Sequence, residues 1–203
     1  MKKFTFMCIL VVLGAGSSAF ATYTSQIWHF DTQDPSPAPD VVDNHPSIGP
    51  ASLAVTPGPQ GGWIDGAWEL SGEIDVIVEN NPVPELYKTI RIELLWRPGD
   101  LDSFLPKQPL VGVTAIPTAD GSLYIPMADM EMVVTDNPLV GSEWTMSVYD
   151  IIVRPNPARE WIAIKGNIVV DDLKIETECI PEPATMGLLG LGSLALLRFR
   201  RKS

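Results

Sequence analysis

The regular alternation of apolar and polar residues most constrains the fold of this chain. It is clearest at residues 73–79, which read EIDVIVE, and at residues 88–96, which read KTIRIELLW. Successive side chains of a β-strand point to opposite faces, so a period of two predicts strands that bury one face. The same criterion predicts further strands at residues 25–30, 51–56, 67–70, 110–116, 131–135, 143–153, 160–165 and 167–176.

Short breaks rich in Pro, Gly, Asn and Asp separate these predicted strands. Examples are Pro57-Gly58-Pro59, Pro98-Gly99-Asp100 and Asp120-Gly121. Many short strands and little helical periodicity predict an all-β fold, a single antiparallel β-sandwich. Among sandwich topologies we favour a jelly-roll-like one. Residues 35–50 are rich in Pro and Asp, and we expect them to form a long surface loop.

The chain begins with the pattern of a secretory signal. Lys2 and Lys3 precede a short apolar run, and Ala19-Phe20-Ala21 fits the small-x-small rule of signal peptidase. We therefore expect a signal peptide over residues 1–21, which signal peptidase removes after Ala21. The alternative, an N-terminal membrane anchor, is disfavoured because the apolar run is short and a cleavage pattern follows it.

The region between the two ends is strongly acidic. Residues 22–180 contain eight basic and 24 acidic residues, which gives a formal net charge of −16. Such a surface repels nucleic acid and anionic lipid, so we expect no nucleic-acid partner and a soluble exported domain over residues 22–178. Cys179 is the one cysteine outside the signal peptide. Its place two residues before Pro181 predicts that it lies in an exposed tether.

The end of the chain combines an apolar span with a basic cluster. Residues 184–197, ATMGLLGLGSLALL, carry no charge. As a helix they cover roughly 21 Å, short of the ~30 Å hydrocarbon core, and basic flanking side chains extend that reach by snorkelling. The basic residues that follow are Arg198, Arg200, Arg201 and Lys202. They predict a single membrane-spanning helix with a cytoplasmic C-terminus. A buried core helix is disfavoured because the span has no polar face.

Residues 179–203 resemble a known sorting signal. Pro181-Glu182-Pro183 comes first, then the Gly- and Leu-rich span, then the Arg cluster. Together these parts resemble the PEP-CTERM sorting signal of bacterial exported proteins. The resemblance implies that an exosortase, a membrane-embedded transpeptidase, cuts near Pro181-Glu182-Pro183 and releases or transfers the outer domain. These residues would then be substrate. Their prolines hold an extended segment at the outer surface, the conformation that proteases bind.

A second, shorter resemblance concerns the exported domain. Residues 166–176 read GNIVVDDLKIE. This segment resembles the closing strand of jelly-roll modules of the galactose-binding and lectin-like kind.

Few residues suit nucleophilic catalysis or zinc binding. The only histidines are His29 and His45, and neither lies near a Gly-x-Ser-x-Gly pattern. A structural zinc site also needs spaced cysteines. The many acidic residues offer numerous carboxylate pairs, so a glycosidase pattern discriminates nothing. We expect no enzymatic activity.

Calcium is the cofactor that the acidic residues suit best, because it prefers carboxylate and carbonyl oxygens. Asp31 and Asp34 follow the first predicted strand, and Asp171 and Asp172 lie in the last. First and last strands of a sandwich are often neighbours, so we consider a structural calcium site there. Asp100 and Asp102 are lesser candidates, since they fit a turn. Solvated surface charge is the simpler interpretation of all these carboxylates.

Tryptophans suggest a further possibility, because their rings stack on sugars. Trp63 and Trp68 are flanked by Gly61, Gly62 and Gly66, so they are the tryptophans that we expect to be exposed. Most tryptophans in strands are instead part of the core.

Together these features predict an exported protein of the cell surface or extracellular matrix with a structural or adhesive role. It would cross the inner membrane, be held there transiently with its C-terminus in the cytoplasm, and have signal peptidase and exosortase as partners. A polysaccharide or matrix component is a further possible partner. The alternative is an extracellular carbohydrate-binding module, and a second alternative is a secreted hydrolase.

Overall fold

The computed structural model describes residues 22–46, 48–80, 87–116, 129–154, 157 and 159–180. These residues form an all-β structure. Its strands are β1 (Thr22–His29), β2 (Val41–Asn44), β3 (Ser52–Thr56), β4 (Gly62–Ile64), β5 (Ala67–Leu70), β6 (Glu73–Glu79), β7 (Tyr87–Pro98), β8 (Leu110–Ile116), β9 (Asp129–Pro138), β10 (Thr145–Arg154), β11 (Arg159–Lys165) and β12 (Ile168–Ile180).

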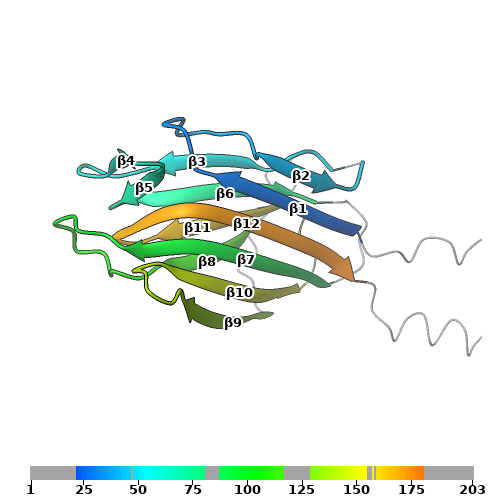
Figure 1. Ribbon diagram of the computed structural model, residues 1–203. Coiled ribbons are helices and arrows are strands. Elements are labelled where there is room, and N and C mark those ends of the chain that lie inside the picture. The colour runs from blue at the N-terminus through cyan, green and yellow to red at the C-terminus, as the bar shows by residue number, and fades with distance from the viewer. Residues whose placement is uncertain are drawn as a thin grey trace, which may run out of the picture.

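The strands form two antiparallel sheets that face each other (Figure 1). The large sheet has the order β2-β1-β12-β7-β10-β9, and the β4–β5 hairpin pairs with β12 at its side. The small sheet has the order β3-β6-β11-β8. The chain passes from one sheet to the other at most connections between these strands, and the exceptions are β1–β2, β4–β5 and β9–β10, which pair within the large sheet. This arrangement confirms the predicted two-sheet, all-β fold.

Alternating burial explains why these segments form strands. In β6 and β11, every second side chain is buried between the sheets, and the residues between them face solvent. The same pattern runs along β7, whose alternate residues from Lys88 to Trp96 face the other sheet. The buried cluster includes Trp28, Leu70, Val76, Ile92, Leu94, Ile151, Ile162, Ile164, Leu173 and Ile175. Burial of this apolar surface is the main contribution to stability, at roughly 25 cal/mol per Å².

A bulge interrupts β12 near its start. The register of β12 against β7 shifts between Val170 and Asp172, which leaves Asp171 as the extra residue. Val170 and Leu173 both face the core, so the bulge turns two consecutive acidic residues away from it. The amide of Phe30 donates to the carbonyl oxygen of Asp171 (3.1 Å), which fixes the bulge against the end of β1.

The predicted strands agree closely with the structure. Three of them, at residues 67–70, 73–79 and 110–116, have the predicted bounds. Two strands of the structure, β2 and β4, were not predicted from the sequence. β2 lies inside residues 35–50, which were expected to be a loop, so that expectation was wrong for residues 41–44. β4 is short and joins β5 through Asp65-Gly66, both at positive φ (50° and 90°), as a tight hairpin turn requires.

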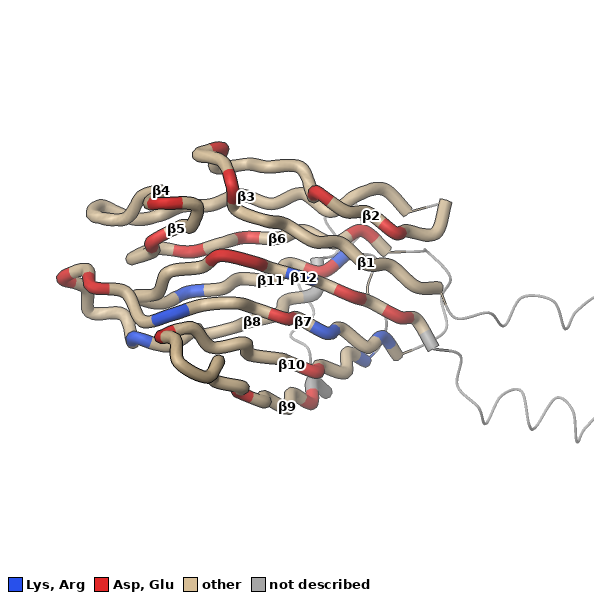
Figure 2. Tube along the Cα trace, in the orientation of Figure 1, with Lys and Arg blue, Asp and Glu red and all other residues tan. Residues whose placement is uncertain are grey.

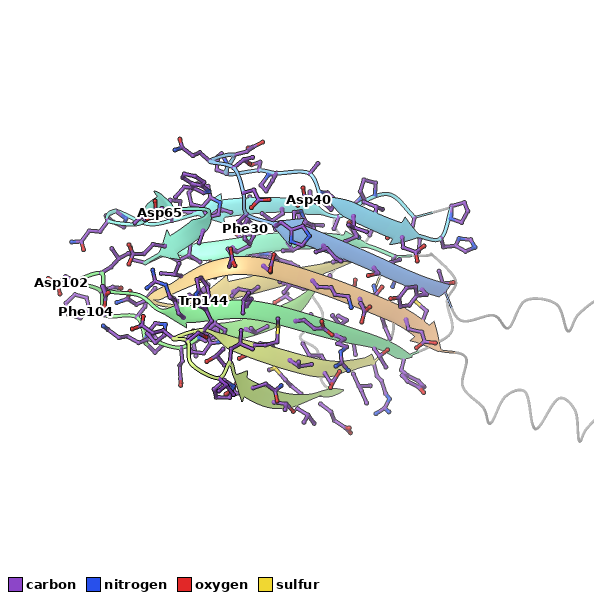
Figure 3. The ribbon with its side chains drawn as sticks, in the orientation of Figure 1. Phe30, Asp40, Asp65, Asp102, Phe104 and Trp144 are labelled. Carbon is purple, nitrogen blue, oxygen red and sulfur yellow. The ribbon has the colours of Figure 1, made fainter. Side chains whose placement is uncertain are left out.

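The two ends of the sandwich differ. β1 starts and β12 finishes at one end (Figure 1), and we call this the terminal end. Asp65, Asp102 and Phe104 lie in loops at the opposite end (Figure 3). Acidic residues are spread over strands and loops of both sheets (Figure 2).

Candidate functional site

The sorting motif begins where the fold ends. β12 continues through Ile180, which pairs with Tyr87 of β7, and Pro181 is the next residue. The sheet therefore extends two residues beyond the domain boundary expected at residue 178. Pro181, Glu182 and Pro183 lie outside the described residues, as do the span 184–197 and the basic residues Arg198, Arg200, Arg201 and Lys202. The part of the chain that the structure describes contains no helix long and apolar enough for a bilayer.

Cys179 corrects one expectation about this junction. The sequence placed it in an exposed tether, but its side chain is buried and only 6% exposed. It pairs with Thr22 on one side and with Lys88 on the other, and its thiol donates to Oδ1 of Asn80 (3.1 Å). The prediction failed because β12 continues its alternation through Cys179, which faces the core as Leu173, Ile175 and Thr177 do.

The first strand lies beside the last. All eight residues of β1 pair with β12, from Thr22 opposite Cys179 to His29 opposite Asp172. The expected signal-peptidase site at Ala19 and Ala21 lies outside the described residues, and Thr22 directly follows it. The residue after the expected signal-peptidase cut and the residue before the sorting motif therefore lie on adjacent strands at the terminal end (Figure 1).

Acidic residues gather where β1 meets the bulge of β12. Nδ1 of His29 lies 2.5 Å from Oδ1 of Asp172, and the His29 amide donates to Asp40 (2.7 Å). The hydrogen bond to Asp172 raises the pKa of His29, and the negative charges of Asp40 and Asp31 act in the same direction. Burial raises the pKa of Asp171, and the charges of Asp172 and Asp31 raise it further.

This cluster brings together three of the four calcium candidates, Asp31, Asp171 and Asp172. The fourth, Asp34, instead accepts a hydrogen bond from the amide of Ser36 (2.8 Å). Among the described residues, no three His, Cys, Asp or Glu side chains are grouped as a metal site requires. Calcium binding stays a prediction. The lesser candidate Asp100 lies in the loop after β7, where its amide donates to Glu69 (3.1 Å).

The tryptophans expected to be exposed are not. Trp68 is 5% exposed, and Trp63 is partly buried against the core and donates from its indole nitrogen to the carbonyl of Phe30 (2.9 Å). Of the glycines around them, Gly61 allows a close backbone approach and Gly66 takes the positive φ of the hairpin turn. A Cβ on Gly61 would lie 2.2 Å from the carbonyl oxygen of Pro57. The expectation of two exposed tryptophans was wrong, because β5 places Trp68 on the inner face of the large sheet.

The tryptophan with substantial exposure is Trp161, which is 40% exposed on the outer face of the small sheet. Its indole nitrogen donates to Asp75 on the neighbouring strand β6 (2.7 Å), which fixes the orientation of the ring. A shallow groove runs beside it, lined also by Ile77, Pro37 and Pro39. The alternation of β11 places Trp161 on the outward-facing side of the strand, and this sequence signal could have identified it as the exposed tryptophan.

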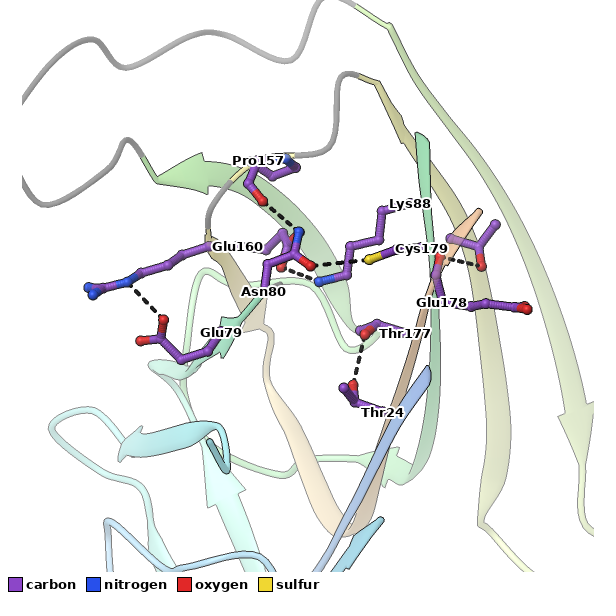
Figure 4. A network of polar contacts seen from close by, with 11 residues as sticks. Thr24, Glu79, Asn80, Lys88, Pro157, Glu160, Thr177, Glu178 and Cys179 are labelled. Carbon is purple, nitrogen blue, oxygen red and sulfur yellow. Dashed lines mark hydrogen bonds and ion pairs between the residues drawn. The ribbon is translucent and has the colours of Figure 1, made fainter. Parts of the chain in front are cut away.

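A buried ion pair lies under the terminal end, and the sequence analysis missed it. Nζ of Lys88 lies 2.7 Å from Oε2 of Glu160, and both side chains are fully buried. Lys88 belongs to the large sheet and Glu160 to the small sheet, so the pair joins the two sheets (Figure 4). The sequence nevertheless indicates that both side chains are buried, because each occupies a position of its strand where the alternation requires an apolar residue.

These features define a β-sandwich whose last strand leads directly into a peptide at the terminal end. Residues 180–202 match the family model of the PEP-CTERM protein-sorting motif. The match begins at Ile180, the last residue of β12. This motif implies an exported protein that an exosortase sorts to the cell surface. Comparison with curated proteins and with solved structures found no significant match.

Proposed function

We propose that this protein is a structural or adhesive component of the cell surface or extracellular matrix. In this proposal the sorting motif delivers the sandwich and is then removed. The observation that carries it is the match of residues 180–202 to the PEP-CTERM motif, which begins at the last residue of β12. The jelly-roll topology that we favour is consistent with a chain that crosses between the sheets at most connections.

The structure supports exosortase cleavage at a peptide bond within a short stretch of the chain. Cys179 is buried and paired on both sides, and Thr177 is 3% exposed. A protease needs an extended segment that is free of other pairing, so cleavage before Ile180 would require β12 to leave the sheet. We place the cut at Pro181 or beyond it. The released domain then keeps its complete large sheet.

Processing tests the proposal. We expect replacement of Pro181, Glu182 and Pro183 by Ala, in a host that contains an exosortase, to leave a larger and membrane-bound form. An antibody against the sandwich would detect it after fractionation. The control changes Thr32 and Gln33 to Ala, since both are exposed and far from the motif in sequence.

We expect the control to be processed like the unaltered protein. Mass spectrometry of the released domain then locates its C-terminus. Normal release of the triple variant would contradict the sorting proposal, and a C-terminus before Ile180 would contradict the proposed location of the cut.

A carbohydrate-binding role is the second candidate, and Trp161 is the observation that favours it. The ring is exposed beside a shallow groove and is held by Asp75, which suits stacking on a sugar. The secreted hydrolase has less support. His29 forms a surface ion pair with Asp172, and the groove beside Trp161 contains neither histidine.

A further inference from the structure

The buried ion pair of Lys88 and Glu160 is unusual in a core formed by the mainly apolar inner faces of two sheets. Both side chains have no exposed area, and their charged atoms are 2.7 Å apart. Removing two charges from water costs several kcal/mol each, which their attraction repays only with further hydrogen bonds. Oε1 of Glu160 is buried and has no hydrogen-bond partner among the described residues. An ion pair that leaves one buried carboxylate oxygen without a hydrogen bond contributes poorly to stability. The pair therefore suggests a chemical role.

Asn80 is the third member of this cluster. It follows Val78 by two residues and so continues the inward face of β6. Glu160 lies opposite Val78 in the β6–β11 pairing, which makes Asn80 and Glu160 diagonal neighbours. Lys88 lies opposite Cys179 in the large sheet, and the thiol of Cys179 contacts Oδ1 of Asn80 (3.1 Å). The side chains of Lys88, Asn80 and Glu160 therefore converge from two sheets (Figure 4).

The carboxamide of Asn80 is fixed at both ends. Oδ1 accepts from Cys179, and Nδ2 donates to the carbonyl oxygen of Pro157 (2.5 Å). Figure 4 shows this carboxamide pointing toward the ion pair of Lys88 and Glu160. Burial raises the pKa of Glu160, while the charge of Lys88 acts in the opposite direction. The raised pKa favours the acid form of Glu160, the form in which it can donate a proton.

We propose that Lys88 and Asn80 form an intramolecular isopeptide bond, with Glu160 as the proton carrier. Neutral Nζ of Lys88 attacks Cγ of Asn80, and Glu160 donates its proton to the carboxamide as the tetrahedral intermediate forms. Glu160 then takes a proton from the attacking nitrogen and passes it to the departing amide nitrogen. The C–N bond of the carboxamide breaks, ammonia leaves, and a Lys88–Asn80 amide remains. The hydroxyl proton of the intermediate returns to Glu160, which is thereby regenerated as the acid, and no oxidant or second substrate is needed.

The bond would join the end of β6 in the small sheet to the start of β7 in the large sheet. It lies at the terminal end, where β12 leads into the sorting motif. It replaces a buried ammonium by a neutral amide, which removes the cost of burying that charge. This inference is independent of the proposed surface role, because the reaction needs only the folded sandwich.

Digestion with a Glu-specific protease tests the bond directly. In the full chain isolated from its host, cuts after Glu79, Glu85 and Glu93 produce peptides 80–85 and 86–93. We expect the two peptides to remain joined, with a combined mass lower by one ammonia than the sum of the separate peptides. Fragmentation should place the link between Asn80 and Lys88. Two separate peptides from the unaltered protein would overturn the proposal.

Variants separate this bond from a succinimide at Asn80, which also loses ammonia but leaves the peptides separate. Lys88→Arg, Asn80→Ala and Glu160→Gln should each abolish the joined species. Lys165→Arg is the matched control, because Lys165 pairs with Glu73 at the surface and the link should persist. A joined species in Glu160→Gln would overturn the role of Glu160. If a variant does not fold, the digest of the unaltered protein still decides whether the bond exists.

Discussion

Thr22 and Cys179 lie directly opposite each other in the antiparallel pairing of β1 and β12. They are the first residue expected after signal removal and the residue before the matched sorting motif. The expected signal peptide and the matched sorting motif thus adjoin the same end of the sandwich. If both are processed, signal peptidase and exosortase would act beside neighbouring strands without any rearrangement of the domain.

The buried contact between Thr24 and Thr177 should measure the strength of this pairing. Their hydroxyl oxygens are 2.7 Å apart, and both residues are almost fully buried. We expect Thr24→Val alone to cost about 1–3 kcal/mol in the free energy of unfolding, because it leaves the Thr177 hydroxyl without its partner. The double variant with Thr177→Val should recover most of the loss. Denaturant unfolding would measure both, and equal losses in single and double variants would contradict the prediction.

Asp171 should destabilise the protein at neutral pH. Burial and the charges of Asp172 and Asp31 raise its pKa in the folded state, so stability decreases as the pH rises through that pKa. Asp171→Asn should therefore raise the melting temperature at neutral pH. The gain should vanish below the usual aspartate pKa of 3.8, where both states are protonated. Thermal melts across this range would measure the difference.

Asp172→Asn is the matched control for Asp171 and should have the opposite sign. It removes the partner that raises the pKa of His29. A raised histidine pKa contributes stability that is fully present below the usual value of 6.5 and is lost as the pH rises through the folded value. Asp172→Asn should thus lower the melting temperature below pH 6.5. A rise in that pH range would contradict the ion pair.

Calcium should affect the same cluster if it binds there. We expect millimolar calcium to raise the melting temperature of the unaltered protein, and Asp171→Asn to reduce that rise. A chelator should reverse it. Identical melts with calcium and with chelator would remove Asp31, Asp34, Asp171 and Asp172 as ligands.

Two tryptophans should respond in opposite ways to replacement by alanine. Trp161→Ala should reduce retention on a polysaccharide column, with little change in unfolding, because the ring is exposed. Trp63→Ala should instead lower the free energy of unfolding by up to roughly 3 kcal/mol, because it removes core contacts and the bond to Phe30. Unchanged retention of both variants, or no retention of the unaltered protein, would count against carbohydrate binding.

The basic residues at the end of the chain should control its orientation. Replacing Arg198, Arg200, Arg201 and Lys202 by Gln removes the charges that hold the C-terminus in the cytoplasm. We expect less processed domain, measured by fractionation and antibody detection. The control replaces exposed Lys107 and Arg154 of the sandwich by Gln. Normal processing of the quadruple variant would contradict the predicted orientation.

The strands were predictable from the sequence because alternation and burial express the same geometry. Residues 73–79 alternate without a break, and the structure buries every second one. Neighbouring first and last strands were also expected, and the pairing of Thr22 with Cys179 confirms this. β2 escaped because its four residues are all exposed or partly exposed, so no alternation marks them.

Features that depend on contacts across the core were not predictable. Glycines around Trp63 suggested exposure, but the ring is partly buried against the core and its indole nitrogen bonds to Phe30, which is distant in sequence. The alternation marks Lys88 and Glu160 as inward-facing, but their pairing with each other follows only once β7 and β11 face each other. The bulge at Asp171 likewise arises from pairing with β7, which the residues of β12 alone do not specify.

The position of β12 between β1 and β7 determines how the domain responds to a pull on its C-terminal end. Tension at Ile180 acts along the strand, whereas the backbone hydrogen bonds on both sides run across it. All of these bonds are loaded together in shear, and none can be opened one at a time from the pulled end. A domain attached through this strand would therefore resist drag from flowing liquid until much of the large sheet gives way at once.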